Sequence, residues 1–102
     1  MEFNKEKIEE MLENIEEADV ELFHEDEDIN DLVSCADVEY DRWLEFIEQT
    51  DDMDYYETEL KHMAKYINTD YYLVRCIDYY LLPSMCYVVF DKDYKFIDVI
   101  YM

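Results

Sequence analysis

The sequence predicts an α+β fold in which three N-terminal helices pack on a small antiparallel sheet that ends in a C-terminal β-hairpin. Three observations lead to this prediction. Apolar residues recur at helical spacing up to Asn68, aromatic and β-branched residues dominate the remainder, and Pro83 separates two runs of the strand type. With 102 residues, of which 51% are hydrophobic, we expect a single domain, residues 1–102, with a helical part (1–68) and a strand part (69–102).

The first predicted helix lies near the N-terminus. Its apolar stripe consists of Ile8, Met11, Leu12, Ile15, Ala18 and Leu22. Asn4 precedes the stripe and can cap the helix, because its side chain can accept a hydrogen bond from a free backbone N–H. Glutamates fill the remaining positions, so we expect one apolar face and a charged remainder.

The second and third predicted helices follow the same period. The second has the stripe Ile29, Leu32, Val33, Ala36, Tyr40, Trp43, Leu44 and Ile47, and the third has the stripe Met53, Tyr56, Leu60, Met63, Ala64 and Ile67. Asp26 and Asp28 precede the second helix as caps. Thr50, Asp51 and Asp52 begin the third, where carboxylates complement the helix dipole.

Residues 71–78 predict a strand, because they are rich in aromatic and β-branched side chains. A helix that continues to Leu82 is the alternative, since Leu73, Ile77 and Leu81 also fit a helical period. Pro83 would end either element.

Residues 85–91 and 94–101 predict a β-hairpin around a Lys92-Asp93 turn. The expected cross-strand pairs are Val88 with Ile97, Cys86 with Val99, and Tyr87 with Asp98. The turn lacks the glycine that two-residue hairpin loops favour. The apolar end of the hairpin, residues 99–102, would form an edge suited to pairing with a second copy, so a homodimer is one expected assembly.

The charge is distributed unevenly along the chain. Residues 1–59 hold 24 acidic residues against Lys5, Lys7 and Arg42, which accounts for the whole formal net charge of −21, and the remainder is neutral. A small domain needs a net charge of only about 2–8 for solubility. Like charges three or four positions apart on a helix repel by about 0.2–0.5 kcal/mol per pair. We therefore interpret the acidic helices as a binding face. An adaptor domain whose acidic face serves only solvation is an alternative.

The acidic part restricts the class of partner. Phosphates and anionic lipid headgroups would be repelled, so nucleic acid and membrane are excluded as direct ligands. The complementary surface is the lysine- and arginine-rich groove of a nucleic-acid-binding protein or nuclease complex. Carboxylates along a helix recur about 5–6 Å apart, comparable to the phosphates of a nucleic acid strand. The sequence therefore predicts an inhibitor that occupies such a groove by mimicking the charge of DNA or RNA.

The predicted partner-binding residues belong to the three predicted helices and their caps. They are Glu6, Glu9, Glu10, Glu13, Glu16, Glu17, Glu25, Asp26, Glu27, Asp28, Asp37, Asp41, Glu45, Glu48, Asp51, Asp52, Asp54 and Tyr55. Tyr55 belongs to this set because exposed tyrosines are enriched among residues that dominate binding energy.

No catalytic, cofactor or metal site is predicted, and we expect no enzyme. His24 and His62 lie beside acidic residues without a serine or cysteine nucleophile pattern, and a chain without glycine cannot form a glycine-rich phosphate loop. Cys35, Cys76 and Cys86 lack the spacing of a zinc site and are interpreted as small buried hydrophobic residues.

The chain shows no secretory signal pattern and no apolar run near the roughly 20 residues that cross a bilayer, and its three cysteines suit a reducing compartment. We therefore expect a cytoplasmic protein. In size, composition and charge layout, a small, acidic, tyrosine-rich domain without glycine resembles phage-encoded DNA-mimic inhibitors, including antirestriction and anti-CRISPR proteins. The resemblance implies an inhibitor of a host defence nuclease. An immunity protein that neutralises a basic nuclease toxin would look physically the same and remains an alternative.

Overall fold

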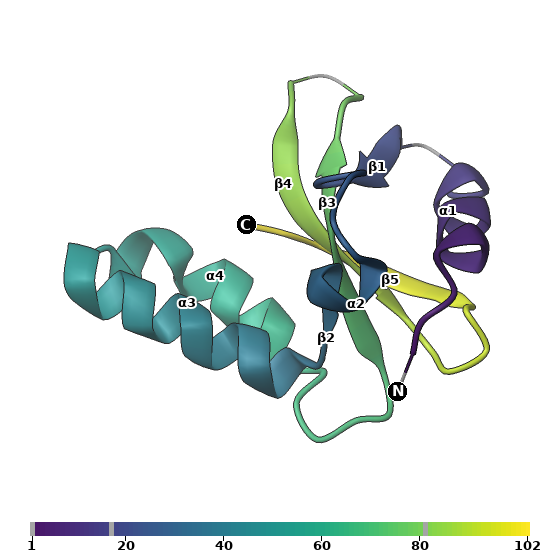
Figure 1. Ribbon diagram of the computed structural model, residues 1–102. Coiled ribbons are helices and arrows are strands. Elements are labelled where there is room, and N and C mark those ends of the chain that lie inside the picture. The colour runs from purple at the N-terminus through teal and green to yellow at the C-terminus, as the bar shows by residue number, and fades with distance from the viewer. Residues whose placement is uncertain (1, 17, 81) are drawn as a thin grey trace.

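The computed structural model describes residues 2–16, 18–80 and 82–102, and it shows an antiparallel sheet with helices on both faces (Figure 1). The helices are α1 (Lys5–Glu13), α2 (Ile29–Leu32), α3 (Ala36–Thr50) and α4 (Met53–Ala64). The strands are β1 (Val20–Leu22), β2 (Val33–Ser34), β3 (Tyr72–Asp78), β4 (Ser84–Phe90) and β5 (Phe96–Tyr101). The α+β class predicted from the sequence is therefore confirmed.

The sheet has the strand order β1-β3-β4-β5, and β2 pairs with β3 beside β1. The two long central strands, β3 and β4, pair along their full length from Tyr72↔Phe90 to Asp78↔Ser84. The short strands β1 and β2 cover the outer edge of β3, whereas β5 forms the opposite edge of the sheet.

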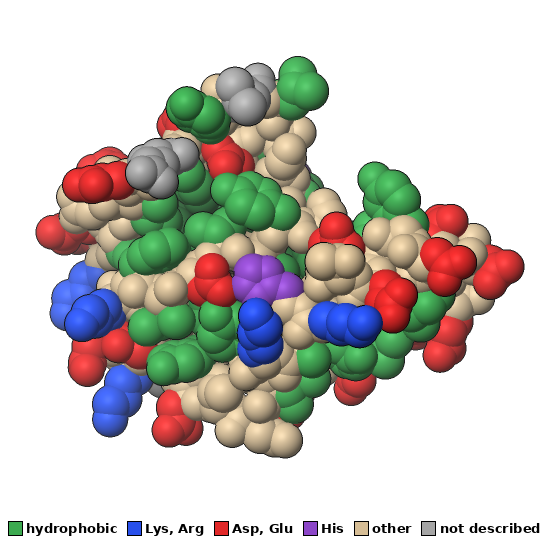
Figure 2. Space-filling view, turned by 180° about the vertical axis from the view of Figure 1, so that it is seen from behind, with side chains coloured by type: hydrophobic (Ala, Val, Ile, Leu, Met, Phe, Trp, Pro, Cys, Tyr) green, Lys and Arg blue, Asp and Glu red, His purple; other side chains and the backbone are tan. Residues whose placement is uncertain are grey.

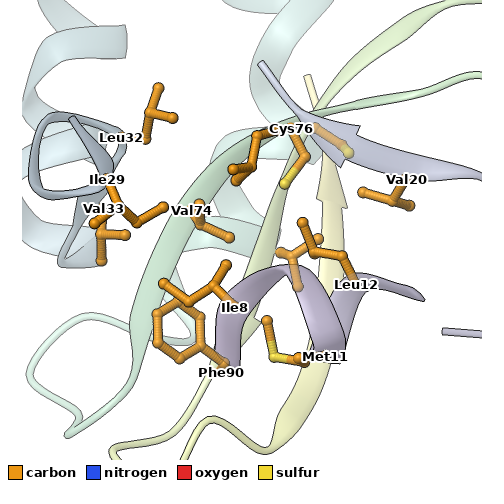
Figure 3. Packing of buried hydrophobic residues seen from close by; sticks show 13 residues of the cluster. Ile8, Met11, Leu12, Val20, Ile29, Leu32, Val33, Val74, Cys76 and Phe90 are labelled. Atoms are coloured by element: carbon orange, nitrogen blue, oxygen red, sulfur yellow. The ribbon is translucent and has the colours of Figure 1, made fainter. Parts of the chain in front are cut away.

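One face of the sheet packs against α1. Alternate residues of the central strands, among them Val74, Cys76 and Phe90, meet Ile8 and Leu12 of α1 in a buried cluster (Figure 3). Burial of a large aliphatic or aromatic side chain contributes roughly 1.5–3 kcal/mol. The expectation that Cys76 and Cys86 are buried is confirmed, while Cys35 is only partly buried.

The other face packs against α3 and α4. Leu73, Tyr87 and Val89 point to this side and form a second cluster with Ala36 of α3 and Met63 of α4. The two helices form an antiparallel pair whose connecting turn lies at the end farthest from the sheet (Figure 1). The helical layers therefore lie on opposite faces of one sheet.

The prediction for the first helix is correct at its start and wrong at its end. Asn4 caps α1 as expected, since its Oδ1 accepts a hydrogen bond from Lys7 N at 3.2 Å. The helix ends at Glu13, however, and residues 20–22 form β1 instead of a last helical turn. Val20 and Leu22 are buried and Glu21 is exposed, a pattern that pairing with Asp78 to Cys76 imposes.

The second predicted helix is broken in two. Asp28 caps the short α2 through Asn30 N, as expected for one of the two proposed caps. Val33 and Ser34 then form β2 opposite Val74 and Leu73, so the apolar stripe from Ile29 to Ile47 is not continuous. The backbone hydrogen bonds gained from β3 replace those of a continuing helix.

The third helix and the strand predicted over residues 71–78 are confirmed in type. The helical alternative is wrong, because Tyr72–Asp78 form β3, and Leu81, which it also used, lies outside the described residues. Asp51 lies in the left-handed region (φ 58°) and ends α3, and α4 begins two residues later. Ile67, assigned to the third stripe, lies beyond the end of α4 but still packs against the second core cluster.

The C-terminal hairpin exists, but its register differs from the predicted one by two residues. Val88 pairs with Val99, Cys86 with Tyr101, and Tyr87 with Ile100. The Asp91 side chain accepts hydrogen bonds from the backbone N–H groups of Asp93 and Lys95, and Tyr94 adopts a positive φ of 61°. These contacts stabilise a longer connection than Lys92-Asp93, and an irregularity at Val89/Phe90 adjusts the ladder.

Candidate functional site

The predicted binding carboxylates are mostly at the surface. All of those that the structure describes are exposed except Asp37, which is partly buried, and Glu17 lies outside the described residues. The ion pairs found within the described ranges use Glu39, Glu57 and Asp98, so they involve none of the predicted binding carboxylates. Because they are exposed and outside these ion pairs, the predicted carboxylates are accessible to a basic partner.

Two of these residues have a local structural role. Asp28 caps α2, and Asp37 accepts a hydrogen bond from the backbone N–H of Asn68 at 3.2 Å, which ties the segment after α4 to the start of α3. Carboxylates that satisfy backbone N–H groups have a reason to be acidic without any partner.

The acidic residues do not form one face, which corrects the sequence-based expectation. Glu6 to Glu13 lie on α1, and Asp41 to Asp54 lie on α3, α4 and their turn, so the sheet separates the two groups (Figure 1). Figure 2 shows the same separation from behind, with acidic side chains gathered at the end formed by α3 and α4 and again near α1. The acidic residues of α1 and those of the α3–α4 pair therefore form two separate surfaces.

The end of the α3–α4 pair, residues 45–59, is called the hairpin tip here. It holds seven acidic residues and no lysine or arginine. They are Glu45, Glu48, Asp51, Asp52, Asp54, Glu57 and Glu59. Only Glu57 has a basic partner in the described structure, Lys61 at 3.0 Å, and that pair is largely exposed and therefore weak. The hairpin tip is thus a concentrated negative surface.

Aromatic side chains lie among these charges. Tyr56 contacts Trp43, Phe46 and Tyr55 with ring centroids 5.3, 6.4 and 4.8 Å apart, respectively. Tyr55 is 75% exposed and Phe46 is 46% exposed. The prediction that Tyr55 faces outward is confirmed, and its ring contacts the ring of Tyr56 edge to face.

A buried carboxylate fixes the base of this helix pair to the sheet. Glu39 of α3 is only 2% exposed, and its Oε1 accepts hydrogen bonds from Ser34 Oγ of β2 at 2.7 Å and Arg75 Nη2 of β3 at 3.3 Å. Arg42 Nη1, one turn along α3, donates to the same oxygen at 2.8 Å. Glu39 therefore connects α3 to two strands through one atom.

The second oxygen of Glu39 reaches a third strand. Tyr87 Oη of β4 donates to Glu39 Oε2 at 2.8 Å and in turn accepts a hydrogen bond from Trp43 Nε1 at 3.0 Å. Burial raises the pKa of Glu39, but hydrogen bonds from Ser34, Tyr87 and Arg75 together outweigh it and hold the pKa below its ordinary value. Burial and the neighbouring carboxylate raise the pKa of Tyr87, so its hydroxyl stays protonated and able to donate.

An acidic hollow lies between α1 and β1. Its volume is about 150 Å³, and its lining includes Glu9, Glu13, Glu21 and Glu25. Three of these were among the predicted binding residues, and Glu21, which is exposed on β1, was not. This hollow has no exposed aromatic side chain in its lining.

The sequence reasoning also missed Phe46 and Glu39. Phe46 falls off the apolar stripe of its helix, and an apolar residue in that position is exposed once the stripe is buried. Glu39 lies three positions after Ala36 and four before Trp43, so it shares the buried stripe. The helical period of the sequence therefore indicates both the exposure of Phe46 and the burial of Glu39.

A similar arrangement anchors α4 to β5. His62 Nε2 and Tyr66 Oη both contact Asp98 Oδ2, with the histidine at 2.7 Å. Burial raises the pKa of Asp98, but hydrogen bonds from Tyr66, His62 and Val99 N outweigh it and lower the pKa. The Val99 N–H on the edge strand is thereby satisfied within the chain at 2.8 Å. The predicted homodimer would have to form around this occupied amide.

Comparison with protein-family models, with curated proteins and with solved structures found no match to this chain. Within residues 2–16, 18–80 and 82–102, no group of three or more histidine, cysteine, aspartate or glutamate side chains is arranged to hold a metal ion. None of the helices described in those ranges is long and apolar enough to cross a membrane.

Proposed function

We propose that the protein is an inhibitor that binds the basic, nucleic-acid-binding groove of another protein with the hairpin tip. The observation that carries this proposal is the combination, at one end of the molecule, of partly exposed aromatic rings with carboxylates of which only Glu57 has an ion pair in the described structure. Charge at the tip favours approach to a basic groove, and the rings supply the apolar contact that interface hot spots need.

Charge alone would give fast but unselective association. Seven carboxylates on two adjacent helices and their turn replace the phosphates that the groove normally neutralises, so binding would release counterions and weaken as salt increases. Tyr55 is the most exposed of the tip aromatics, and tyrosine contributes large contact area at low conformational cost. Tyr55 is therefore the proposed anchor amid the charge.

The Glu39 network contributes rigidity to this function. It joins α3 to β2, β3 and β4 with three hydrogen bonds of 2.7 to 3.3 Å, and Arg42 of the same helix adds a fourth at 2.8 Å. A binding element that is already held in place loses little conformational entropy on binding. The α3–α4 pair would thus enter a groove in the conformation that it already has in the free protein.

The carboxylates of α1 have a supporting role in this proposal. They lie on the far face of the sheet, so they remain exposed when the hairpin tip is buried in a groove. Their negative field would oppose the approach of nucleic acid to the same protein. The resemblance to phage inhibitors makes a defence nuclease the first target class to examine.

The test is competition with nucleic acid. The protein is immobilised, exposed to a cleared bacterial lysate at about 50 mM salt, and then washed with a double-stranded oligonucleotide at the same ionic strength. We expect the oligonucleotide to release captured nucleic-acid-binding proteins, and about 200 mM salt to weaken their capture by at least tenfold. Capture that neither the oligonucleotide nor the salt reduces would contradict groove binding and favour the adaptor alternative.

A further inference from the structure

A cleft at the base of the α3–α4 pair differs from the acidic surfaces around it. It has a volume of about 260 Å³ and lies between α3 and the sheet. Its walls include Trp43 and Phe46 from α3, Met85 from β4, and Phe23, which follows β1. Arg42 and Arg75 also line it, so we call it the arginine cleft.

The arginine cleft has a surplus of positive charge. Arg42 and Arg75 both contact Glu39, which is the one carboxylate in the lining, so two guanidinium groups face a single negative charge. Their side chains are 55% and 28% exposed, whereas the Glu39 side chain is 2% exposed. The negative charge lies beneath the surface, and the positive charges are the ones a ligand can reach.

Hydrogen-bonding capacity remains on the two arginines. A guanidinium has five N–H groups, and the described contacts use only Nη1 of Arg42 and Nη2 of Arg75. Both oxygens of Glu39 are already occupied, by Ser34, Arg42 and Arg75 on one side and by Tyr87 on the other. The polar part of the cleft can therefore offer further donors but few further acceptors.

Size and lining restrict the ligand further. A dry cavity of roughly 150 Å³ accommodates benzene, so 260 Å³ is enough for one ring with a short polar substituent. Aromatic walls favour a planar ring that stacks or meets them edge-on. The acidic hollow between α1 and β1 is lined by four glutamates and would reject the same ligand.

We infer that the arginine cleft binds a small aromatic molecule that carries one negative charge. The ring packs on the wall that Met85 forms with Trp43 and Phe46, whose rings meet edge to face, and the anionic group accepts hydrogen bonds from Arg42 and Arg75. The net charge of the protein opposes the approach of an anion from a distance. About 0.15 M salt reduces the range of that repulsion to roughly 8 Å and leaves the contact with the arginines. The inference does not depend on the proposed partner, because its ligand is a free small molecule.

The chain contains a built-in reporter for this site. Trp43 is its only tryptophan and lines the cleft, so tryptophan fluorescence reports on occupancy directly. Three probes separate the requirements: phenylacetate has a ring and a charge, phenylacetamide has the ring without the charge, and acetate has the charge without the ring. At about 0.15 M salt, we expect phenylacetate to change the fluorescence saturably and to bind about tenfold more tightly than phenylacetamide, with no response to acetate.

Matched variants locate the response. Arg42→Gln should weaken phenylacetate binding about tenfold and leave phenylacetamide binding unchanged, and Phe46→Ala should weaken both. Phe96→Ala, a partly exposed phenylalanine on β5 outside the cleft, is the control and should change neither. Circular dichroism and the melting temperature establish that each variant is folded.

Each of four results would overturn the inference, and the first three concern phenylacetate and the arginines. They are the absence of a saturable response to phenylacetate, equal affinities for phenylacetate and phenylacetamide in the unmodified protein, or an unchanged preference for the anion in folded Arg42→Gln. A response to acetate equal to that of phenylacetate would show that the ring contributes nothing and would overturn it as well.

Discussion

The two helical faces of the sheet both carry many carboxylates, yet their surroundings differ. On α1 the glutamates share the helix with Lys5 and Lys7, and the nearby hollow is lined by glutamates and aliphatic side chains. At the hairpin tip no basic residue interrupts the acids, and Tyr55, Phe46 and Tyr56 lie among them. Negative charge is common to both helical faces, whereas the exposed aromatic contact area of Tyr55 and Phe46 belongs to the hairpin tip of the α3–α4 pair. The difference identifies the hairpin tip as the better candidate for specific binding.

The largest expected effect concerns the Glu39 network, which holds the α3–α4 pair on the sheet. Glu39→Ala should lower the free energy of unfolding by about 3 kcal/mol, because it leaves the buried Tyr87 hydroxyl and Arg75 without their acceptor. Urea denaturation measures this change. Glu48→Ala, on the exposed side of the same helix, is the matched control and should stay within about 0.5 kcal/mol of the unmodified protein. Equal midpoints of urea denaturation for the two variants would show that the Glu39 network does not stabilise the fold.

A smaller effect separates aromatic contact from charge. Tyr55→Ala should weaken capture of the nucleic-acid-binding partner about tenfold without changing its salt dependence, because the charges are untouched. Tyr80→Ala removes a similarly exposed tyrosine between β3 and β4 and should leave capture unchanged. The comparison is made by titrating the immobilised variants. If both substitutions had the same effect, Tyr55 would not be an anchor.

The smallest expected effect is a change in acid sensitivity. The pKa of Glu39 is held below its ordinary value of 4.5 in the folded chain, so its ionised form stabilises the fold above that pH, and the contribution is lost as pH falls through the folded-state pKa. The free energy of unfolding should therefore decrease less steeply below about pH 4.5 in Glu39→Gln than in the unmodified protein. Asp78 and Asp98, whose pKa values are also lowered, are present in both proteins and account for the pH dependence that Glu39→Gln retains. Denaturation curves at several pH values measure it, and identical slopes would contradict a native-state role for the ionised group.

What could be predicted from the sequence was local. Asn4 and Asp28 cap helices through their own side chains within three residues, and the strand character of residues 72–78 is evident from composition. The strands β1 and β2 have three and two residues and exist through pairing with β3, more than 30 positions away, so no local pattern marks them.

The features of the candidate site likewise divide into those that local sequence predicts and those that depend on nonlocal contacts. Exposure of Tyr55 and of the predicted carboxylates that lie on helices, except the partly buried Asp37, agrees with the helical period. Their separation onto opposite faces follows from where the sheet inserts between α1 and α3, which depends on nonlocal pairing. The arginine cleft brings Arg42 together with Arg75 from a different element, and spacing in the sequence does not reveal that contact.

The most direct test of the account compares two variants with equal loss of charge. One neutralises the tip with Glu45→Gln, Glu48→Gln, Asp52→Asn and Asp54→Asn, and the other neutralises α1 with Glu6→Gln, Glu9→Gln, Glu10→Gln and Glu13→Gln. All eight side chains are exposed, so both variants should remain folded. Binding of the captured nucleic-acid-binding protein is then measured at about 0.1 M salt. We expect the tip variant to lose affinity by at least tenfold and the α1 variant by no more than about threefold. Equal losses would mean that net charge alone drives binding, and a larger loss in the α1 variant would place the binding surface on the other face of the sheet.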